Sequence, residues 1–265
     1  MGPDYGVSPF ALAMLRIAGS AVVFIPLYLA MGTSRVRSWR DVGVLTILSV
    51  LGIVNNQALY LAGLRITSPI SATLLVAMIP VFTILIVAVT GRARLTSRQI
   101  LGTAIAFLGI GVLMDFALPR LGDTLVLLNA LSFALYVVYS KEILERLGAL
   151  TVMAWVFGIA TLLFLLSGAL DVVTETPNWS AGAIWLVVYI VLVPTILVYA
   201  ANAWALRYAS PGQVTIYMFL QPVIVALLVW IQLGQELSTQ TLYAAILTTL
   251  GVALVLTAKR QGRKA

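Results

Sequence analysis

The sequence predicts an all-helical, polytopic membrane protein built from two five-helix repeats in inverted orientation. Three observations carry this prediction. The composition is too apolar for a water-soluble domain of 265 residues, because 62% of the residues are hydrophobic, only 9% are charged and the mean hydropathy is +1.07. A sequence pattern also recurs at a fixed distance along the chain. Finally, basic residues alternate between successive loops.

Apolar runs long enough to cross a bilayer, which takes roughly 20 residues, occur nine times. Continuous runs of this length indicate helices, because the strands of a membrane barrel alternate apolar and polar residues. The predicted spans cover residues 8–31, 42–61, 69–89, 99–116, 122–140, 151–170, 181–203, 212–233 and 239–257. The breaks between them are short and leave no room for a soluble domain.

The recurring pattern is the motif Leu-Arg-x-x-Ser-Pro at residues 64–69, which returns 142 residues later at residues 206–211. In each copy the Ser-Pro pair precedes an apolar run, which is typical of a serine N-cap followed by proline at the first helical position. Further positions recur at the same offset: Thr73, Pro80, Val81, Leu108 and Gly109 return as Thr215, Pro222, Val223, Leu250 and Gly251.

The offset also defines the repeat unit. It maps the last four spans onto the first four, whereas the fifth span, 122–140, has no counterpart within the chain. The unit therefore has five spans, and an odd number of crossings inverts the second copy relative to the first. We expect an N-terminal repeat over residues 1–120 and a C-terminal repeat over residues 121–265. Inverted repeats are a recurrent architecture of secondary transporters, which alternate access by moving one repeat against the other.

Basic residues orient the chain. One set of alternate loops carries two arginines, Arg65 and Arg120, whereas the other set carries thirteen basic residues: Arg35, Arg37, Arg40, Arg92, Arg94, Arg98, Lys141, Arg146, Arg207, Lys259, Arg260, Arg263 and Lys264. By the positive-inside rule the richer set and the C-terminus face the cytoplasm. We expect a multi-pass protein of a bacterial inner (plasma) membrane. The net charge of +7 does not indicate nucleic acid, because it is not gathered with groove-reading partners on one surface.

Several segments resemble a known family. They are the run from Ser8-Pro9 to Arg16, the segment from Ala58 through Tyr60 and Gly63 to Arg65, and Gln221-Pro222 with Gly234-Gln-Glu236. In this order they are similar to the EamA-type members of the drug/metabolite transporter superfamily. The resemblance implies ten helices in two halves that move small organic solutes such as amino acids, other metabolites or drugs, with export as the expected direction. This chain has nine predicted spans, so either the first family helix lies upstream of Met1, which we expect, or the protein is a genuine nine-span form.

Polar residues inside spans need a partner or a cavity. The strongest group is Asn55, Asn56 and Gln57, followed one helical turn later by Tyr60. On the fifth span Asn129, Ser132, Tyr136 and Tyr139 form a polar stripe, and the second repeat offers Thr195, Tyr199, Asn202, Thr215, Tyr217 and Gln221. We select seven of these residues as lining a solute cavity between the repeats: Asn56, Tyr60, Asn129, Tyr136, Tyr199, Asn202 and Gln221. Interhelical hydrogen bonding is the competing interpretation.

Arg16 is the one basic residue placed within a predicted span. Its charge costs roughly 2.5 to 3.5 kcal/mol at the bilayer centre. In a structural role, Arg16 would interact with a helix-end carbonyl, a carboxylate or the outer lipid headgroups. In a functional role, it would attract the carboxylate of a solute.

We select three prolines inside predicted spans as candidate hinges, namely Pro80, Pro194 and Pro222. Each removes one helix hydrogen bond and favours a kink. The kinks either act as hinges during transport or reflect static packing.

The missing residue types narrow the chemistry. The chain has no cysteine and no histidine, so disulfides and the usual zinc and haem ligands are excluded, and we expect no metal and no cofactor. A membrane-embedded enzyme would need a nucleophile with a base or paired carboxylates, which the spans lack, so we expect no catalytic residues. A channel or facilitative pore for small solutes stays open as the alternative to a carrier. The solute, the direction of transport, the coupling ion and the oligomeric state are left open by the sequence.

Overall fold

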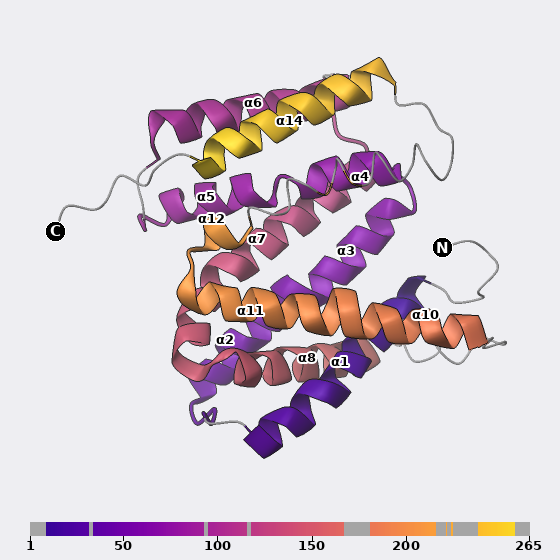
Figure 1. Cartoon of the computed structure of the whole chain (residues 1–265), viewed down its shortest axis with the longest axis vertical. Coiled ribbons are helices and arrows are strands. Elements are labelled where there is room, and N and C mark those ends of the chain that lie inside the picture. Colours follow the sequence, from indigo (N-terminus) through magenta and orange to yellow (C-terminus); the bar gives the residue numbers. More distant parts are fainter. Residues whose placement is uncertain are drawn as a thin grey trace. The chain divides into compact units, whose positions relative to one another are not determined.

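The computed structural model describes residues 9–31, 34–92, 95–115, 118–166, 181–215, 221, 224 and 238–257. Within these ranges every regular element is helical (Figure 1). The helices are α1 (Pro9–Met31), α2 (Trp39–Ser49), α3 (Asn55–Leu64), α4 (Pro69–Val76), α5 (Ile79–Val89), α6 (Ser97–Leu113), α7 (Leu121–Leu147), α8 (Ala149–Leu166), α10 (Ala181–Val191), α11 (Val198–Tyr208), α12 (Pro211–Val214) and α14 (Thr239–Thr257). Two π-helical segments, η2 (Val50–Val54) and η3 (Leu192–Leu197), join α2 to α3 and α10 to α11.

Seven stretches of these helices are long and apolar enough to cross a membrane: Ala11–Met31, Trp39–Leu64, Pro69–Val89, Leu121–Leu147, Ala149–Leu166, Ile184–Tyr208 and Thr239–Thr257. A shorter apolar helix, Ser97–Leu113, matches the fourth predicted span. The predicted span over residues 212–233 lies mostly outside the described residues. The all-helical membrane architecture is therefore confirmed, and each of the other eight predicted spans has a helix at its place.

The Ser-Pro motifs begin helices as predicted. Ser68 is the N-cap of α4, where its hydroxyl accepts a hydrogen bond from the backbone N–H of Ser71 at 3.0 Å and Pro69 opens the helix. Ser210 is the N-cap of α12, where Gln213 Oε1 accepts from the Ser210 backbone N–H at 3.0 Å. The third motif, at Ser8, lies outside the described residues.

The chain divides into two compact units, and each is described by itself. Unit 1 comprises Met1–Leu61 and Tyr139–Ala209, and unit 2 comprises Ala62–Val138 and Ser210–Ala265. Each unit therefore takes helices from both sequence repeats. Unit 1 contains the predicted spans 8–31 and 42–61 of the N-terminal repeat together with their equivalents 151–170 and 181–203 of the C-terminal repeat.

In unit 2 the helices α6 and α14, which are equivalent in the two repeats, pack side by side (Figure 1). A Cβ added at Gly102 would lie 2.7 Å from the carbonyl oxygen of Gly251, and one at Gly109 would lie 3.0 Å from that of Ala244. The partner number falls as the α6 number rises, so the two helices are antiparallel. The 142-residue offset relates Gly102 to Ala244 and Gly109 to Gly251, so the same two positions meet in both contacts. The contact between α6 and α14 is therefore self-complementary. This packing is what inverted repeats require.

In unit 1 the helices α1 and α8, which the 142-residue offset also makes equivalent, pack against each other. Phe24 of α1 stacks on Phe157 of α8 with ring centroids 5.5 Å apart. The hydroxyl of Ser49 on α2 donates to the Val156 carbonyl of α8 at 2.8 Å. Small polar and aromatic groups thus hold α1, α2 and α8 in one core.

The prolines break their helices in two different ways. Pro80 is the second residue of α5 and is buried, and α4 ends at Val76, four residues earlier. That position is the one with which a proline ring clashes in a continuous helix. Pro194 instead lies inside the π-helical segment η3. Pro222 lies outside the described residues, and hinge motion at all three stays a prediction.

Candidate functional site

A polar cluster within unit 1 gathers around Arg16, about two turns into α1. The Nε of Arg16 donates to the Thr195 hydroxyl oxygen of η3 at 2.9 Å, and its Nη1 donates to Gln57 Oε1 of α3 at 3.4 Å. Thr195 and Gln57 are buried, with exposed fractions of 1% and 6%, whereas Arg16 is partly buried. Both partners are uncharged, and no carboxylate pairs with Arg16 in the part of the chain that the structure describes.

Thr195 is held in place by the wider turn of η3. Its hydroxyl donates to the carbonyl of Ile190, five residues earlier, at 2.8 Å while it accepts from Arg16. Pro194, the residue before it, has no N–H to give to a regular helix. The π turn therefore accommodates Pro194 and places the Thr195 hydroxyl next to the Arg16 guanidinium. Single π turns of this kind are frequent at functional sites.

The other π-helical segment, η2, begins at Val50. This is 142 residues before η3, which begins at Leu192. The irregular turns are thus equivalent in the two repeats. Gly52 of η2 corresponds to Pro194, and its carbonyl accepts a hydrogen bond from the hydroxyl of Tyr199 at 3.2 Å. Each π turn therefore supplies one oxygen to a polar contact near Arg16.

Gln57 and Tyr199 are themselves repeat equivalents, and both belong to this cluster. The ring of Tyr199 meets the edge of Phe157 with centroids 5.2 Å apart, and Phe157 in turn stacks on Phe24. All three rings are buried. An aromatic layer from α1, α8 and α11 thus backs the polar groups and fixes the Tyr199 hydroxyl.

The structure brings together three of the residues that the sequence selected. Tyr60 and Tyr199 lie close enough to Arg16 to interact with its charge. Asn56 and Asn202 are half-buried in the same unit and engaged in interactions of their own. Their role in binding stays a prediction.

The remaining three selected residues belong to unit 2. Asn129 and Tyr136 on α7 are buried, each with an exposed fraction of 2%, and both have partners within the protein. Phe133 packs on Tyr136 with ring centroids 5.5 Å apart. Gln221 is helical and half-buried. A contact of any of them with a solute stays a prediction.

Sequence reasoning placed Gln57 and Thr195 in the wider polar set but did not select them, and it missed Gly52. A stronger indication was present in the repeat, because the offset relates Gln57 to Tyr199 and Gly52 to Pro194. Aligning the copies marks these positions, although it does not show which side chains meet.

The cluster contains the kind of group that can hydrogen-bond an anion. A guanidinium presents a planar fork that matches both oxygens of a carboxylate. The Thr195 bond engages Nε, and the longer Gln57 bond is the weaker of the two. Among the described residues no group of three or more His, Cys, Asp or Glu side chains could hold a metal ion. The cluster can therefore orient a carboxylate through hydrogen bonds from one cation.

Comparison with known proteins agrees with this architecture. The EamA-like transporter family matches the chain twice, over residues 4–114 and 120–257. A crystal structure that is 19% identical superposes with a TM-score of 0.69, covering 94% of this chain and 88% of the other, which shows the same fold.

Curated relatives are similar over most of their length. The uncharacterized transporter YdfC of Bacillus subtilis is 23% identical, with 93% of this chain and 81% of the relative covered. A "Probable terminal-alkyne amino-acid exporter" of Streptantibioticus cattleyicolor is 27% identical, with 95% and 84% covered. An uncharacterized transporter of Archaeoglobus fulgidus is 25% identical, with 94% and 89% covered. With both of its repeats matched, the chain belongs to the EamA-like transporter family and is an integral, multi-pass membrane protein.

Proposed function

We propose that this membrane transporter is a secondary carrier that exports small organic solutes bearing a carboxylate, amino acids being the leading candidates, by alternating access of its two inverted repeats. The observation that carries the proposal is Arg16, a cation within a membrane span whose described partners are a hydroxyl and an amide. The relative from Streptantibioticus cattleyicolor, named as an amino-acid exporter, supports both the solute class and the direction.

Binding proceeds by replacement of the weaker contact. Thr195 keeps its bond to Nε and holds the plane of the guanidinium. The solute carboxylate takes Nη1 from Gln57, whose bond is 3.4 Å long, and bonds Nη2 with its second oxygen. Two hydrogen bonds between opposite charges replace one long hydrogen bond from the cation to a neutral amide. The carboxylate also neutralises a cation whose burial in the bilayer costs roughly 2.5 to 3.5 kcal/mol.

The other selected residues complete the proposal. Tyr60 and Tyr199, next to Arg16, supply hydroxyl and aromatic surface. Asn56, Asn129, Tyr136, Asn202 and Gln221 supply further hydrogen-bonding groups to the solute, and Pro80, Pro194 and Pro222 allow the spans to flex.

The test is transport of radiolabelled amino acids by the purified chain in proteoliposomes. We expect saturable uptake and counterflow with wild type, and loss of both with Arg16→Gln. Arg16→Lys should retain part of the affinity, because it keeps the charge but not the fork. Arg37→Gln, which removes an exposed loop cation, is the matched control.

Circular dichroism and size-exclusion chromatography establish that each variant is folded. Undiminished transport of a zwitterionic amino acid by folded Arg16→Gln would refute the role of Arg16. A conductance that does not saturate with solute would instead favour a pore.

A further inference from the structure

The helix pair α10–α11 carries two tryptophan–tyrosine pairs, each with a spacing of four residues. Trp185 and Tyr189 lie near its start, and Trp204 and Tyr208 near its end. All four side chains are exposed, with fractions of 73%, 58%, 62% and 70% in that order. Large exposed aromatic side chains at the two ends of a membrane span are typical of the aromatic belts at the membrane–water interfaces.

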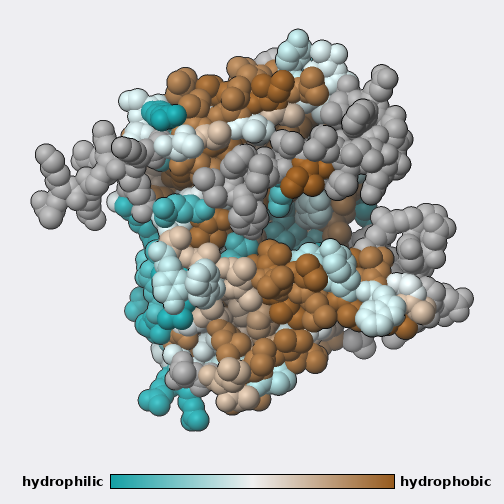
Figure 2. Space-filling view, viewed as in Figure 1, coloured by the Kyte–Doolittle hydropathy of each residue, from teal (hydrophilic) through white to brown (hydrophobic). Residues whose placement is uncertain are grey.

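The π turn between the pairs brings them onto one face. Residues 185 and 204 are 19 positions apart, and η3 adds about one residue to the regular winding. The remaining rotation corresponds to about 18 helical residues, which is five turns, with a rise of about 27 Å. This is close to the hydrocarbon thickness of about 30 Å. Leu192 and Leu197 between the pairs are exposed as well, so this face is apolar between two aromatic ends, as Figure 2 shows for α11.

The two ends differ in charge. At the end of α11 the guanidinium carbon of Arg207 lies 5.7 Å from the centre of the Tyr208 ring, and the rings of Trp204 and Tyr208 are 5.3 Å apart. Arg207 is exposed, and within the described ranges no carboxylate pairs with it. The belt formed by Trp185 and Tyr189 has no basic residue on its helix α10.

Arg207 is not needed to cap its own helix. The ammonium of Lys141 on α7 donates to the carbonyls of Leu206 and Ala209, each at 3.0 Å, and pairs with Glu145 at 2.7 Å. Two carbonyls at the end of α11 are thereby satisfied without Arg207. The Arg207 guanidinium lies over the Tyr208 ring instead, with its Nη1 3.9 Å from where a Cβ on Gly148 would stand.

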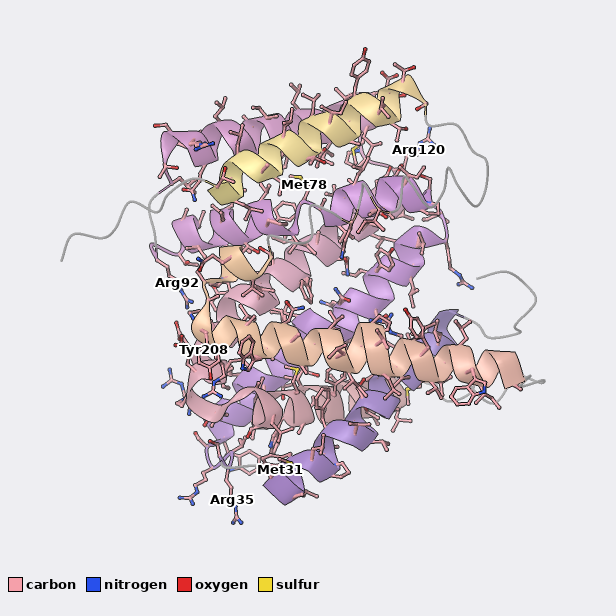
Figure 3. All side chains as sticks on the ribbon, viewed as in Figure 1. Met31, Arg35, Met78, Arg92, Arg120 and Tyr208 are labelled. Atoms are coloured by element: carbon pink, nitrogen blue, oxygen red, sulfur yellow. The ribbon has the colours of Figure 1, made fainter. Side chains whose placement is uncertain are left out.

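We propose that the end of α11 binds the headgroup of an anionic phospholipid, with the phosphate on Arg207 and the upper acyl chains against Trp204 and Tyr208. Charge complementarity selects an anion, and the apolar face that continues from the site selects a lipid over free phosphate. The loop of Arg35, which the positive-inside rule assigns to the cytoplasmic leaflet, lies toward the same side: Figure 3 shows both Arg35 and Tyr208 on the left of unit 1.

Titration of the detergent-purified full chain with phosphatidylglycerol and with phosphatidylcholine of the same acyl chains, followed by native mass spectrometry, tests the site. Wild type should retain phosphatidylglycerol preferentially. Arg207→Gln should weaken that binding about fivefold, the usual effect of one basic residue near an anionic surface. Arg37→Gln removes an equal charge from an exposed loop of the same unit and should have a much smaller effect.

Two outcomes overturn the proposal. One is the absence of any preference for phosphatidylglycerol in wild type. The other is an equal loss in Arg207→Gln and Arg37→Gln, which would show diffuse attraction by the loops.

A second pair of variants tests the aromatic part of the site. Trp204→Leu with Tyr208→Leu should reduce phosphatidylglycerol retention, whereas Trp185→Leu with Tyr189→Leu should leave the preference for it unchanged. Displacement of the lipid by millimolar inorganic phosphate alone would assign the site to a free anion and contradict the lipid assignment. The readout is lipid binding, so it does not depend on the transported solute.

Discussion

At the scale of single residues, the environment of Arg16 is what makes the proposed solute site specific. The Thr195 hydroxyl donates its only proton to the Ile190 carbonyl of α10, so toward Arg16 it can act only as an acceptor, and it accepts there from Nε. In the proposed site the threonine is therefore a positioning residue that acts through the arginine and does not need to touch the solute.

This role predicts a contrast between two substitutions of Thr195. Thr195→Val preserves shape but leaves the guanidinium without its shorter hydrogen bond, which is worth about 1.5 to 3 kcal/mol when one partner is charged. We expect the KM for transport to rise about tenfold or more in proteoliposomes with little change in the maximal rate. Thr195→Ser restores the acceptor and should restore the KM. Equal KM values for the two variants would argue against positioning.

At the scale of elements, the contact between α6 and α14 depends on the absence of side chains. A Cβ at Gly102 or Gly109 would come within 3.0 Å of the opposing backbone. Such close approach of small residues lets backbones pack in a membrane, where the hydrophobic effect does not drive helices together. Small residues stand at the equivalent positions of both repeats, so the same sequence pattern allows α6 and α14 to approach each other closely.

Alanine substitutions should therefore separate glycines that pack from a glycine that does not. Gly109→Ala should lower the free energy of unfolding in detergent by about 1 to 3 kcal/mol, because the helices must move apart. Gly43 of α2 has no atom within 4 Å of an added Cβ, so Gly43→Ala should be neutral or stabilising by up to about 1 kcal/mol. Thermal unfolding followed by tryptophan fluorescence measures both. Equal shifts would contradict close packing at α6 and α14.

At the scale of the whole molecule, the sequence repeats and the compact units divide the chain differently. Each unit pairs equivalent helices of the two copies, α1 with α8 and α6 with α14. Related surfaces that are inverted can be self-complementary, which explains why the copies interleave. The boundary we expect near residue 120 therefore describes the repeats and not the compact units.

The orientation of the whole chain can be tested by labelling single introduced cysteines, because the protein has no cysteine of its own that would react. Single cysteines at Arg37 and at Leu118, both exposed, lie in loops that the charge pattern assigns to opposite sides. In intact cells a membrane-impermeant maleimide should label Leu118→Cys at once, and Arg37→Cys only after permeabilisation. The reverse order would overturn the predicted cytoplasmic C-terminus.

The sequence by itself determined the membrane embedding, the places of the helices, the Ser-Pro caps and the duplication with its inversion. These properties follow from hydropathy, local capping and the odd number of spans, which are all read along the chain. Only the tertiary structure decided that Arg16 meets Thr195 across 179 residues, that proline 194 is accommodated in a π turn, and that the repeats interleave in two units. Such contacts depend on which helix faces meet, and in an apolar span nearly every face is hydrophobic, so the pattern along the chain does not select one.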